Sequence, residues 1–404
     1  MKKKDTWIKP RHKIITKLAY YIIKPYTIWK YGIQVEVFKE QGNRPYLILA
    51  NHQTPFDQFF VALTFDGKPI YYMATEDIFS LGFLSTLLKW AVAPIPIRKQ
   101  TTDLLAVKNC IKVAKEGGTI AIFPEGNRTY SGQTEYMSPT IASLAKKLRL
   151  PIAFLRIEGG YGIEPRWSDE PRKGKMKCYV SKVLEPEEYK ELTNDELFAI
   201  IEKELYVNEA CLDTEFHHPK RGEYLERLFY VCPHCGLTTF ESQNHLVTCK
   251  QCGSQISYET TKEFKGINQV FPFRFVLDWY NYQKDYMNQL DVLQYTEKPL
   301  YEDTIALSEV IVYKQKNLLR KHAKLSLYGD KLIIDKNTNQ ELILPFTDIS
   351  AITVLGKNKL NVYYNKMIYQ IKADKRFNAV KYVHIFNRHN NISRGDIDGK
   401  FLGL

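Results

Sequence analysis

The chain is organised around the stretch Tyr46-Leu47-Ile48-Leu49-Ala50-Asn51-His52-Gln53-Thr54-Pro55-Phe56-Asp57. The apolar run from Tyr46 to Ala50 has the length and composition of a buried strand. Thr54 and Pro55 are typical of a helix N-cap and the first helical residue, so a helix should follow the strand almost at once. Asp57 would then occupy the third helical position, where a carboxylate can bond back toward the cap.

His52 would lie in the turn between this strand and this helix, close to Asp57. A basic side chain oriented by a nearby carboxylate is the arrangement that activates a hydroxyl nucleophile. The alternative is a histidine buried in a turn, beside an aspartate that only caps the helix. Because a short motif by itself does not separate these two interpretations, the rest of the chain has to decide between them.

Length and composition are those of a folded protein with more than one domain. A chain of 404 residues predicts two or three domains, and 44% hydrophobic with 25% charged residues excludes general disorder. The net charge of +12 favours an anionic partner: nucleic acid, an anionic membrane surface or a phosphorylated substrate. We find no secretory signal and no apolar run of about 18 residues, and therefore expect a cytoplasmic protein with no spanning helix.

Residues 1–34 mix cations with apolar and aromatic side chains and contain a single acid, Asp5. Ile14, Leu18, Ile22 and Trp29 fall near helical spacing, with lysines between them. A basic amphipathic helix with Trp and Tyr at its apolar edge suits the surface of an anionic bilayer. We therefore predict that this segment contacts the inner face of the cell membrane. The alternative is a helix that packs on the domain behind it, with its lysines in solvent.

Residues 35–210 alternate short apolar runs with amphipathic stretches, which predicts an α/β domain with a central mixed sheet flanked by helices. Ligands of such sheets bind beyond the carboxyl ends of the strands. The most hydrophobic piece, residues 81–97, is expected to be a helix followed by a strand within the core. The predicted strands are residues 35–38, 46–50, 70–74, 95–97, 119–123, 152–157 and 177–183, and the predicted helices are residues 55–65, 80–91, 101–116 and 138–148.

Two further motifs stand at the ends of predicted strands. Ile95-Pro96-Ile97-Arg98 ends in an arginine whose fork of donors can hold a phosphate, although a surface ion pair is the commoner use. Phe123-Pro124-Glu125-Gly126-Asn127-Arg128 predicts a tight turn whose glycine lets backbone approach a ligand. Glu125 and Arg128 are expected to project from this turn, the carboxylate toward an acceptor hydroxyl and the guanidinium toward a phosphate. A plain turn is the alternative.

These motifs, together with the proline-led strand Pro151-Ile152-Ala153-Phe154-Leu155, resemble the acyltransferases that act on glycerophosphate and lysophospholipids. The similarity covers about residues 35–205. His52 and Asp57 match the first conserved block of that family, Arg98 the second, and the string from Phe123 to Arg128 the third. Two positions depart from the pattern: Asn127 stands where threonine is frequent, and Leu155 where a second proline is common.

The resemblance implies transfer of a fatty acyl group from an acyl thioester, either acyl-CoA or acyl carrier protein, to a lysophospholipid hydroxyl in phospholipid biosynthesis. The default acceptor is 1-acylglycerol-3-phosphate. His52 would be the general base and Asp57 its orienting carboxylate. Arg98 and Arg128 would bind the acceptor phosphate in a site shaped by Glu125, Gly126 and Asn127. No acyl-enzyme is required, and these motifs hold no serine or cysteine to form one.

Two Cys-x-x-Cys pairs lie in the second half of the chain: Cys232 with Cys235, and Cys249 with Cys252. Each pair is followed by a glycine, and thirteen residues (236 to 248) separate them. Four thiolates at this spacing predict a structural zinc ion in a ribbon. The family chemistry needs no metal, so the zinc is not expected to take part in catalysis.

The rest of the second half predicts a change of architecture. The aromatic string from Phe271 to Tyr280 is expected to form a helix that links modules. From Lys324 onward, short strands and one final helix resemble a small β-rich domain of the pleckstrin-homology kind. The expected domains are a membrane-contact segment (1–34), an acyltransferase domain (35–210), a zinc ribbon (225–260), a helical linker (264–300) and a β-rich domain (305–390).

Two hypotheses compete with the enzyme. A nucleic-acid-binding protein built on the ribbon and the basic surface is disfavoured because the ribbon interior, residues 237–245, contains no lysine or arginine. A scaffold that only binds lipid would be expected to have lost catalytic residues, yet His52, Asp57, Arg98, Glu125 and Arg128 are all present. We therefore predict an active enzyme with no nucleic-acid partner.

Overall fold

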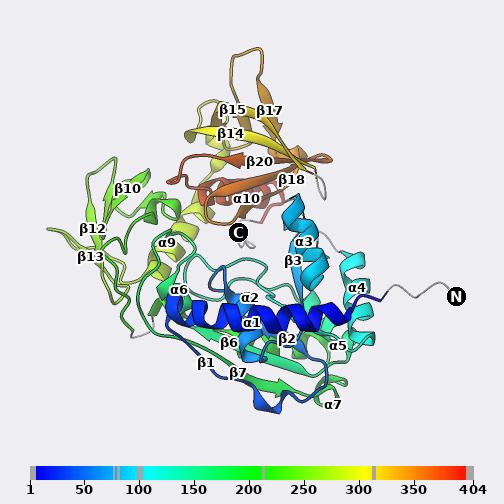
Figure 1. The fold of residues 1–404 in the computed structure, drawn as a ribbon. Helices are drawn as coiled ribbons and strands as arrows, with labels where there is room; N and C mark the ends of the chain where they lie inside the picture. Colours follow the sequence, from blue (N-terminus) through cyan, green and yellow to red (C-terminus); the bar gives the residue numbers. More distant parts are fainter. Residues whose placement is uncertain are drawn as a thin grey trace. The chain divides into compact units, whose positions relative to one another are not determined.

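The computed structural model describes residues 6–75, 78–79, 82–97, 103–211, 214–311 and 315–396 (Figure 1). It divides into two compact units. The first unit contains the chain up to Pro165 together with Lys173–Phe216, and the second contains Arg166–Arg172, His217–Ile311 and the chain from Gln315.

The first unit is built on one mixed sheet with the strand order β1-β7-β6-β2-β5-β3-β4. The five neighbouring strands β6, β2, β5, β3 and β4 are parallel to one another. Strand β7 runs antiparallel to β6, and β1 runs parallel to β7. The sequence-based prediction of a mixed α/β sheet is thus confirmed. The strands are β1 (Ile33–Val35), β2 (Leu47–Ala50), β3 (Ile70–Thr75), β4 (Ile95–Ile97), β5 (Thr119–Ile122), β6 (Ile152–Glu158) and β7 (Met176–Leu184).

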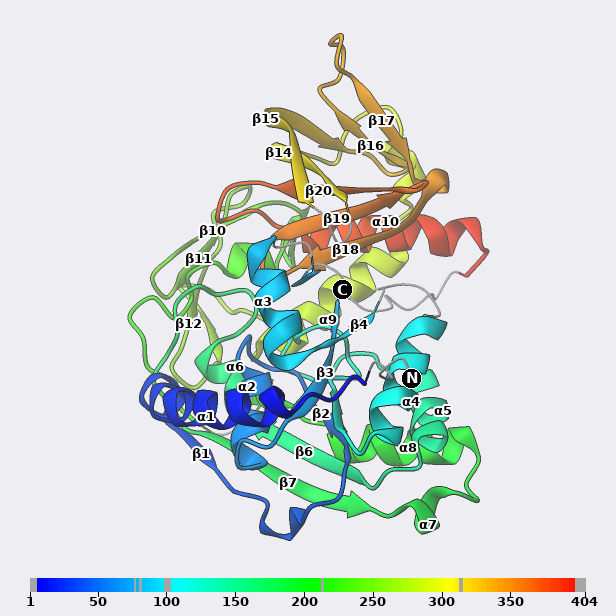
Figure 2. The ribbon, with the colours of Figure 1, turned by 45° about the vertical axis from the view of Figure 1, so that its right-hand side comes forward.

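Helices cover both faces of this sheet because its central strands alternate their side chains between two apolar clusters. Leu47 and Leu49 of β2 face the cluster that includes α4, α5 and α8, whereas Ile48 and Ala50 face the cluster that includes α1 and α2. In Figures 1 and 2, α1 lies across the sheet on the side of α2. The helices are α1 (Pro10–Tyr31), α2 (Asp57–Thr64), α3 (Phe83–Val92), α4 (Leu104–Lys115), α5 (Thr140–Leu148), α6 (Gly160–Ile163), α7 (Pro186–Tyr189) and α8 (Asn194–Leu205).

Two predictions for this unit are wrong in detail. The helix after the His52 turn begins at Asp57, because Thr54–Phe56 form a separate turn held by the Thr54 hydroxyl, which accepts from the Phe56 N–H at 3.1 Å. The helix predicted within residues 81–97 is not a core helix: among the described residues of α3 only Ser85 is buried. The predicted helix ends at residues 80–81 and 101–102 lie outside the described residues.

The second unit begins with a small hairpin and a four-stranded antiparallel sheet. The hairpin pairs β8 (Val231–Cys232) with β9 (Gly236–Leu237), and the sheet has the order β10 (Phe240–Gln243), β11 (Leu246–Cys249), β12 (Gln255–Tyr258), β13 (Phe264–Gly266). The aromatic helix, α9 (Val276–Gln289), starts later than predicted, after Pro272. Phe271 and Phe273 precede it and pack against Trp279, so the aromatic string builds a core rather than one continuous helix.

The remaining chain forms a seven-stranded antiparallel sheet with the order β17-β16-β15-β14-β20-β19-β18, followed by α10 (Val380–Ser393). The sequence pattern predicts the strands from Leu325 onward but not β14 or the start of β15. In that part of β15 most side chains are exposed, so no alternation of apolar and polar residues marks it. The strands are β14 (Tyr301–Ile311), β15 (Gln315–Leu327), β16 (Lys331–Ile334), β17 (Leu342–Pro345), β18 (Ile349–Leu355), β19 (Lys359–Tyr364) and β20 (Met367–Lys372).

Short 3-10 turns complete the two units, and no described helix has the length and hydropathy to cross a bilayer. The turns are η1 (Lys39–Gln41), η3 (Glu209–Cys211), η4 (Leu225–Arg227), η5 (Val292–Tyr295) and η6 (Phe346–Asp348).

Candidate active site

The site begins where β2 ends and the backbone turns away from the sheet. The Asn51 side chain replaces the missing strand pairing: its Nδ2 donates to the Ile157 carbonyl and its Oδ1 accepts from the Ile157 N–H, both at 2.8 Å. This pair of hydrogen bonds to β6 fixes the direction in which the next residue leaves the sheet. His52 is therefore held at the carboxyl end of a central parallel strand, the position where such sheets bind ligands.

His52 and Asp57 form the closest pair in the site. His52 Nδ1 lies 2.7 Å from Asp57 Oδ2, and the aspartate is fully buried. The same carboxylate accepts from the Gln53 N–H at 2.6 Å, from the Thr54 N–H at 3.0 Å and from the Thr54 hydroxyl at 2.7 Å. Because a carboxylate can only accept, the ring proton lies on Nδ1 and Nε2 is the basic nitrogen.

Residues after β5 hold the histidine from the other side. The Phe123 ring stacks on the His52 ring with centroids 4.5 Å apart and 24° between the planes. The His52 N–H donates to Glu125 Oε1 at 2.8 Å, and the His52 carbonyl accepts from the Thr129 N–H at 3.2 Å. The His52 side chain keeps 20% of its surface exposed. The ring is thus fixed in orientation while remaining reachable from solvent.

Glu125 points inward and bonds to backbone, in contrast with the prediction that it projects from its turn. Its Oε1 accepts from His52 and its Oε2 accepts from the Glu135 N–H at 2.8 Å. Burial raises the pKa of this carboxyl to about 8. The two backbone N–H groups favour the anion and lower the pKa, but their effect is smaller than that of burial. The Glu125 carboxyl group therefore joins the turn after β2 to the loop after β5, and in doing so it positions the histidine.

The other predicted residues of this turn lie at its surface. Gly126 has φ +67° and its N–H bonds to the Phe123 carbonyl at 2.9 Å, which closes a tight turn in a backbone region that favours glycine. Gly126 is exposed, and Asn127 and Arg128 are half-buried beside it. Arg98 lies outside the described residues. The structure thus brings His52, Asp57 and Glu125 together, with the Gly126–Arg128 segment next to them.

Three residues contact His52 or Asp57 although the sequence did not mark them as functional. They are Thr54, whose hydroxyl donates to Asp57, Phe123, whose ring stacks on His52, and Thr129, whose N–H donates to the His52 carbonyl. Phe123 and Thr129 flank the predicted Pro-Glu-Gly turn directly, so their positions next to that motif were the available signal. Nothing local marked the pairing between the two turns, because it joins residues more than seventy positions apart.

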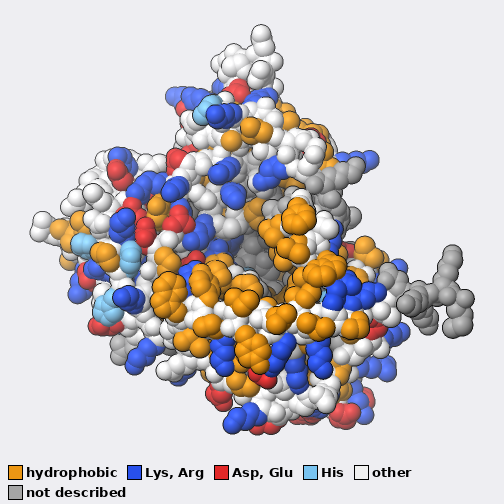
Figure 3. Space-filling model, viewed as in Figure 1, with side chains coloured by type: hydrophobic (Ala, Val, Ile, Leu, Met, Phe, Trp, Pro, Cys, Tyr) orange, Lys and Arg blue, Asp and Glu red, His pale blue; other side chains and the backbone are white. Residues whose placement is uncertain are grey.

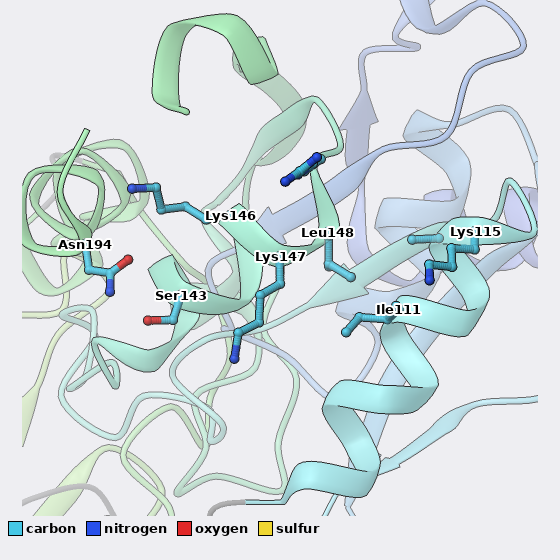
Figure 4. A pocket seen from close by; sticks show the side chains of 9 residues that line it. Ile111, Lys115, Ser143, Lys146, Lys147, Leu148 and Asn194 are labelled. Carbon is cyan, nitrogen blue, oxygen red and sulfur yellow. The ribbon is translucent and has the colours of Figure 1, made fainter. Parts of the chain in front are cut away.

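A separate groove lies elsewhere in the first unit. It has a volume of about 770 Å³ and is lined by α4, α5 and the start of α8, including Lys115, Lys147 and Arg149 (Figure 4). Since α4 ends at Lys115 just before β5 begins, and α5 ends at Leu148 just before β6 begins, this groove lies at the amino ends of the strands. It therefore stands at the edge of the sheet opposite to His52, and it is not the site described above.

The four predicted zinc ligands come together in the second unit. The ligand atoms of Cys232, Cys235, Cys249 and Cys252 all lie within 4.8 Å of one another. The Sγ–Sγ separations are 3.8 Å between Cys232 and Cys252 and 3.6 Å between Cys235 and Cys249. Four sulfurs at about 2.3 Å from one ion would be about 3.8 Å apart at the corners of a tetrahedron, so this set fits zinc.

Comparison with known proteins supports what the motifs implied, because residues 33–157 match the family model described as Acyltransferase. This segment is an acyltransferase domain. The match and the curated relatives support an acyltransferase of the glycerolipid type.

Curated relatives match between 35% and 41% of the chain. It is 25% identical over 161 residues to 1-acyl-sn-glycerol-3-phosphate acyltransferase of Bacillus subtilis, a match that covers 40% of this chain and 77% of the relative. It is 29% identical over 150 residues to the enzyme of the same name from Pseudomonas aeruginosa, covering 35% and 56%. It is 23% identical over 166 residues to the chloroplastic enzyme BAT2 of Brassica napus, covering 41% and 47%.

Among solved structures, this acyltransferase is similar to the 1-acyl-sn-glycerophosphate acyltransferase PlsC of Thermotoga maritima. The TM-score is 0.40 at 20% sequence identity, and the match covers 48% of this chain and 78% of that one. The acyltransferase spans only about half the length of its plant relative.

Proposed function

We propose that this protein transfers a fatty acyl group from an acyl thioester, acyl-CoA or acyl carrier protein, to the hydroxyl of a lysophospholipid, foremost 1-acylglycerol-3-phosphate. The observation that carries the proposal is the 2.7 Å contact between His52 Nδ1 and the buried Asp57 carboxylate at the carboxyl end of β2. The names of the curated relatives support the choice of acceptor.

His52 acts as the general base. Its Nε2 takes the proton of the acceptor hydroxyl as that oxygen attacks the thioester carbonyl carbon. The new C–O bond forms and the C–S bond breaks, and the proton passes from the imidazolium to the departing thiolate. Asp57 holds the proton on Nδ1 and stabilises the imidazolium, the orienting role that a carboxylate has in hydrolytic triads.

The turn after β5 and the end of β4 form the acceptor site in this proposal. Arg128 and Arg98 bind the acceptor phosphate, and Gly126 and Asn127 shape the loop around it. The half-burial of Arg128 next to the His52 turn supports its part in this site. Glu125 contributes by positioning His52 through the backbone bond described above.

The second unit serves structure and localisation. Cys232, Cys235, Cys249 and Cys252 hold one zinc ion that stabilises a ribbon of residues 225–260, and residues 264–300 link it to the β-rich region. We assign residues 305–390 to a domain of the pleckstrin-homology kind. The antiparallel strand order β17-β16-β15-β14-β20-β19-β18 followed by a C-terminal helix supports this assignment.

The protein works at the cytoplasmic face of the cell membrane, with residues 1–34 in contact with anionic lipid and residues 35–210 as the catalytic domain. Exposed apolar side chains on α1, among them Ile22 and Trp29, support membrane contact. Lysines that are exposed on the same helix, among them Lys13 and Lys24, support a preference for anionic lipid.

An assay of the purified protein tests this function. Labelled acyl-CoA and labelled acyl carrier protein are each offered with lysophosphatidate, with other lysophospholipids and with a lipid amine. We expect a diacyl product with lysophosphatidate in the highest yield. Absence of acyl transfer to every acceptor would contradict the proposal and favour a scaffold that only binds lipid or nucleic acid.

A further inference from the structure

The first helix of the chain turns its apolar side to solvent. Its buried residues are His12, Tyr20, Thr27 and Tyr31, which pack toward the domain. Many of its apolar and aromatic residues are exposed, and they repeat at close to helical spacing: Ile14, Leu18, Tyr21, Ile22, Tyr26, Ile28 and Trp29. A helix that packs on its own domain does the reverse, because burial of apolar surface is what stabilises the packing.

The short helix α3 shows the same inversion more strongly. Phe83 has 83% of its surface exposed, and Leu84, Leu87 and Trp90 are exposed as well. Positions 83, 87 and 90 follow helical spacing and form one continuous stripe. The buried residue of this helix is Ser85, whose hydroxyl donates to the Ile78 carbonyl at 2.7 Å. The packing of α3 on the described part of the first unit therefore leaves much of its apolar surface in solvent.

The two helices lie next to each other and present one surface. The Arg11 guanidinium donates to the Trp90 carbonyl at 2.9 Å and lies over the Trp90 ring at 5.5 Å from its centroid. Trp7, just before α1, donates from its indole to the Ala93 carbonyl at 2.9 Å. Figure 3 shows hydrophobic side chains gathered over both helices, with lysines and arginines around them.

The charged side chains of the two helices themselves are all basic. Neither Pro10–Tyr31 nor Phe83–Val92 contains an aspartate or glutamate, whereas both contain lysine. Aromatic side chains beside cations, around an aliphatic stripe, are typical of helices that lie in the headgroup region of an anionic bilayer. A protein partner would need acids to match these cations, and a second copy of the same surface would repel the first.

We infer that α3 inserts into an anionic bilayer together with α1, so that the protein binds the membrane through a two-helix surface rather than through its N-terminal segment alone. Membrane binding by α3 does not depend on the proposed function. Only the purpose of that binding, the delivery of a membrane lipid to His52, rests on it. The inference assigns a binding role to a helix that the sequence pattern predicted to lie in the core.

The topology connects this surface to the site. The chain leaves β3 at Thr75, at the carboxyl edge of the sheet that also carries His52, and α3 begins at Phe83. On α1, the rings of Tyr26 and Tyr31 lie 6.1 Å and 5.4 Å from the ring of Phe56, the residue before Asp57. A lipid that leaves the bilayer beside α3 therefore enters at the edge of the sheet where the base stands.

The test is binding of the full chain to vesicles by flotation, with vesicles of phosphatidylglycerol and phosphatidylcholine in equal parts, and of phosphatidylcholine alone. The variant combines Phe83→Gln, Leu87→Gln and Trp90→Gln. We expect at least a hundredfold weaker binding to the anionic vesicles, because each apolar side chain that inserts is worth about tenfold or more. A matched control removes exposed apolar surface elsewhere, with Val270→Gln and Ile267→Gln in the second unit, and should bind as the wild type does.

Two further measurements separate the outcomes. Circular dichroism and thermal unfolding of the triple variant should match the wild type, since the replaced side chains are exposed. Acyl transfer to a short-chain, monomeric lysophosphatidate should be unchanged while transfer to vesicle-borne acceptor falls. The inference would be overturned if the triple variant floated with the vesicles as the wild type does. It would also be overturned if sedimentation showed a dimer of the wild type that the triple variant no longer forms, while vesicle binding stayed intact. If the wild type transfers no acyl group to any acceptor, the proposed function fails, and flotation alone still decides the role of α3.

Discussion

Replacement of Asp57 by asparagine removes one charge from the centre of the proposed site with little change in shape. The carboxylate accepts from His52 Nδ1, the Gln53 N–H, the Thr54 N–H and the Thr54 hydroxyl. An asparagine oxygen can still accept from His52 and Gln53, so the turn should remain folded. What the variant loses is the attraction between the aspartate and the imidazolium, which exists only once the base has taken its proton.

The size of that loss follows from the 2.7 Å contact. It places the two charge centres about 4 Å apart, where opposite unit charges attract by about 4 kcal/mol at the effective dielectric of a protein site. Since about 1.4 kcal/mol corresponds to tenfold in rate, Asp57→Asn should lower kcat/KM by about a thousandfold.

The assay is mass-spectrometric detection of the diacyl product from acyl-CoA and lysophosphatidate. Asp103→Asn is the matched control, because Asp103 caps α4 by accepting from the Leu105 and Ala106 N–H groups at 3.0 Å and has no part in the proposed chemistry. Asparagine is an equally good cap, so this control should keep full activity. If Asp57→Asn were folded and within threefold of the wild type, the account of His52 as a base oriented by this carboxylate would be refuted.

Two other predictions concern Glu125 and the zinc site. Glu125→Gln should lower activity by about tenfold to a hundredfold, because its amide group can accept only one of the two backbone N–H groups that the carboxylate binds and leaves a buried donor unpaired. Burial raises the pKa of Glu125 to about 8, so the folded state binds its proton more tightly than the unfolded chain does. The resulting contribution to stability is fully present below pH 4.5 and is lost as pH rises through 8. The plot of Tm against pH should therefore be flatter for the glutamine variant than for the wild type. Metal analysis should find zinc bound to the purified protein, and a chelator should lower the unfolding temperature of the second unit.

The order of elements in the first unit was predictable because each central strand is a short apolar run with a turn signal at its end. Leu47–Ala50 and Ile152–Glu158 are buried on both faces and read directly as strands. Asp57 was expected to bond back toward the turn before its helix, and it does so through Thr54. The four cysteines were predictable for a similar reason, since their spacing alone fixes a shared site.

Other features depend on contacts that no local pattern contains. Glu125 occurs in a turn motif typical of ligand binding, yet both of its oxygens bond to backbone, one of them more than seventy residues earlier in the chain. The α3 sequence is apolar enough for a core helix, and only the fold shows that Phe83 and Trp90 face solvent. Composition tells how apolar a helix is, and it does not tell what lies against it.

The most direct test of the account is product formation by His52→Ala, measured with labelled acyl-CoA and lysophosphatidate under conditions where the wild type is active. We expect a loss of about a hundredfold to ten-thousandfold, the range typical of a general base, with thermal unfolding close to that of the wild type. Activity equal to the wild type in the folded variant would contradict it.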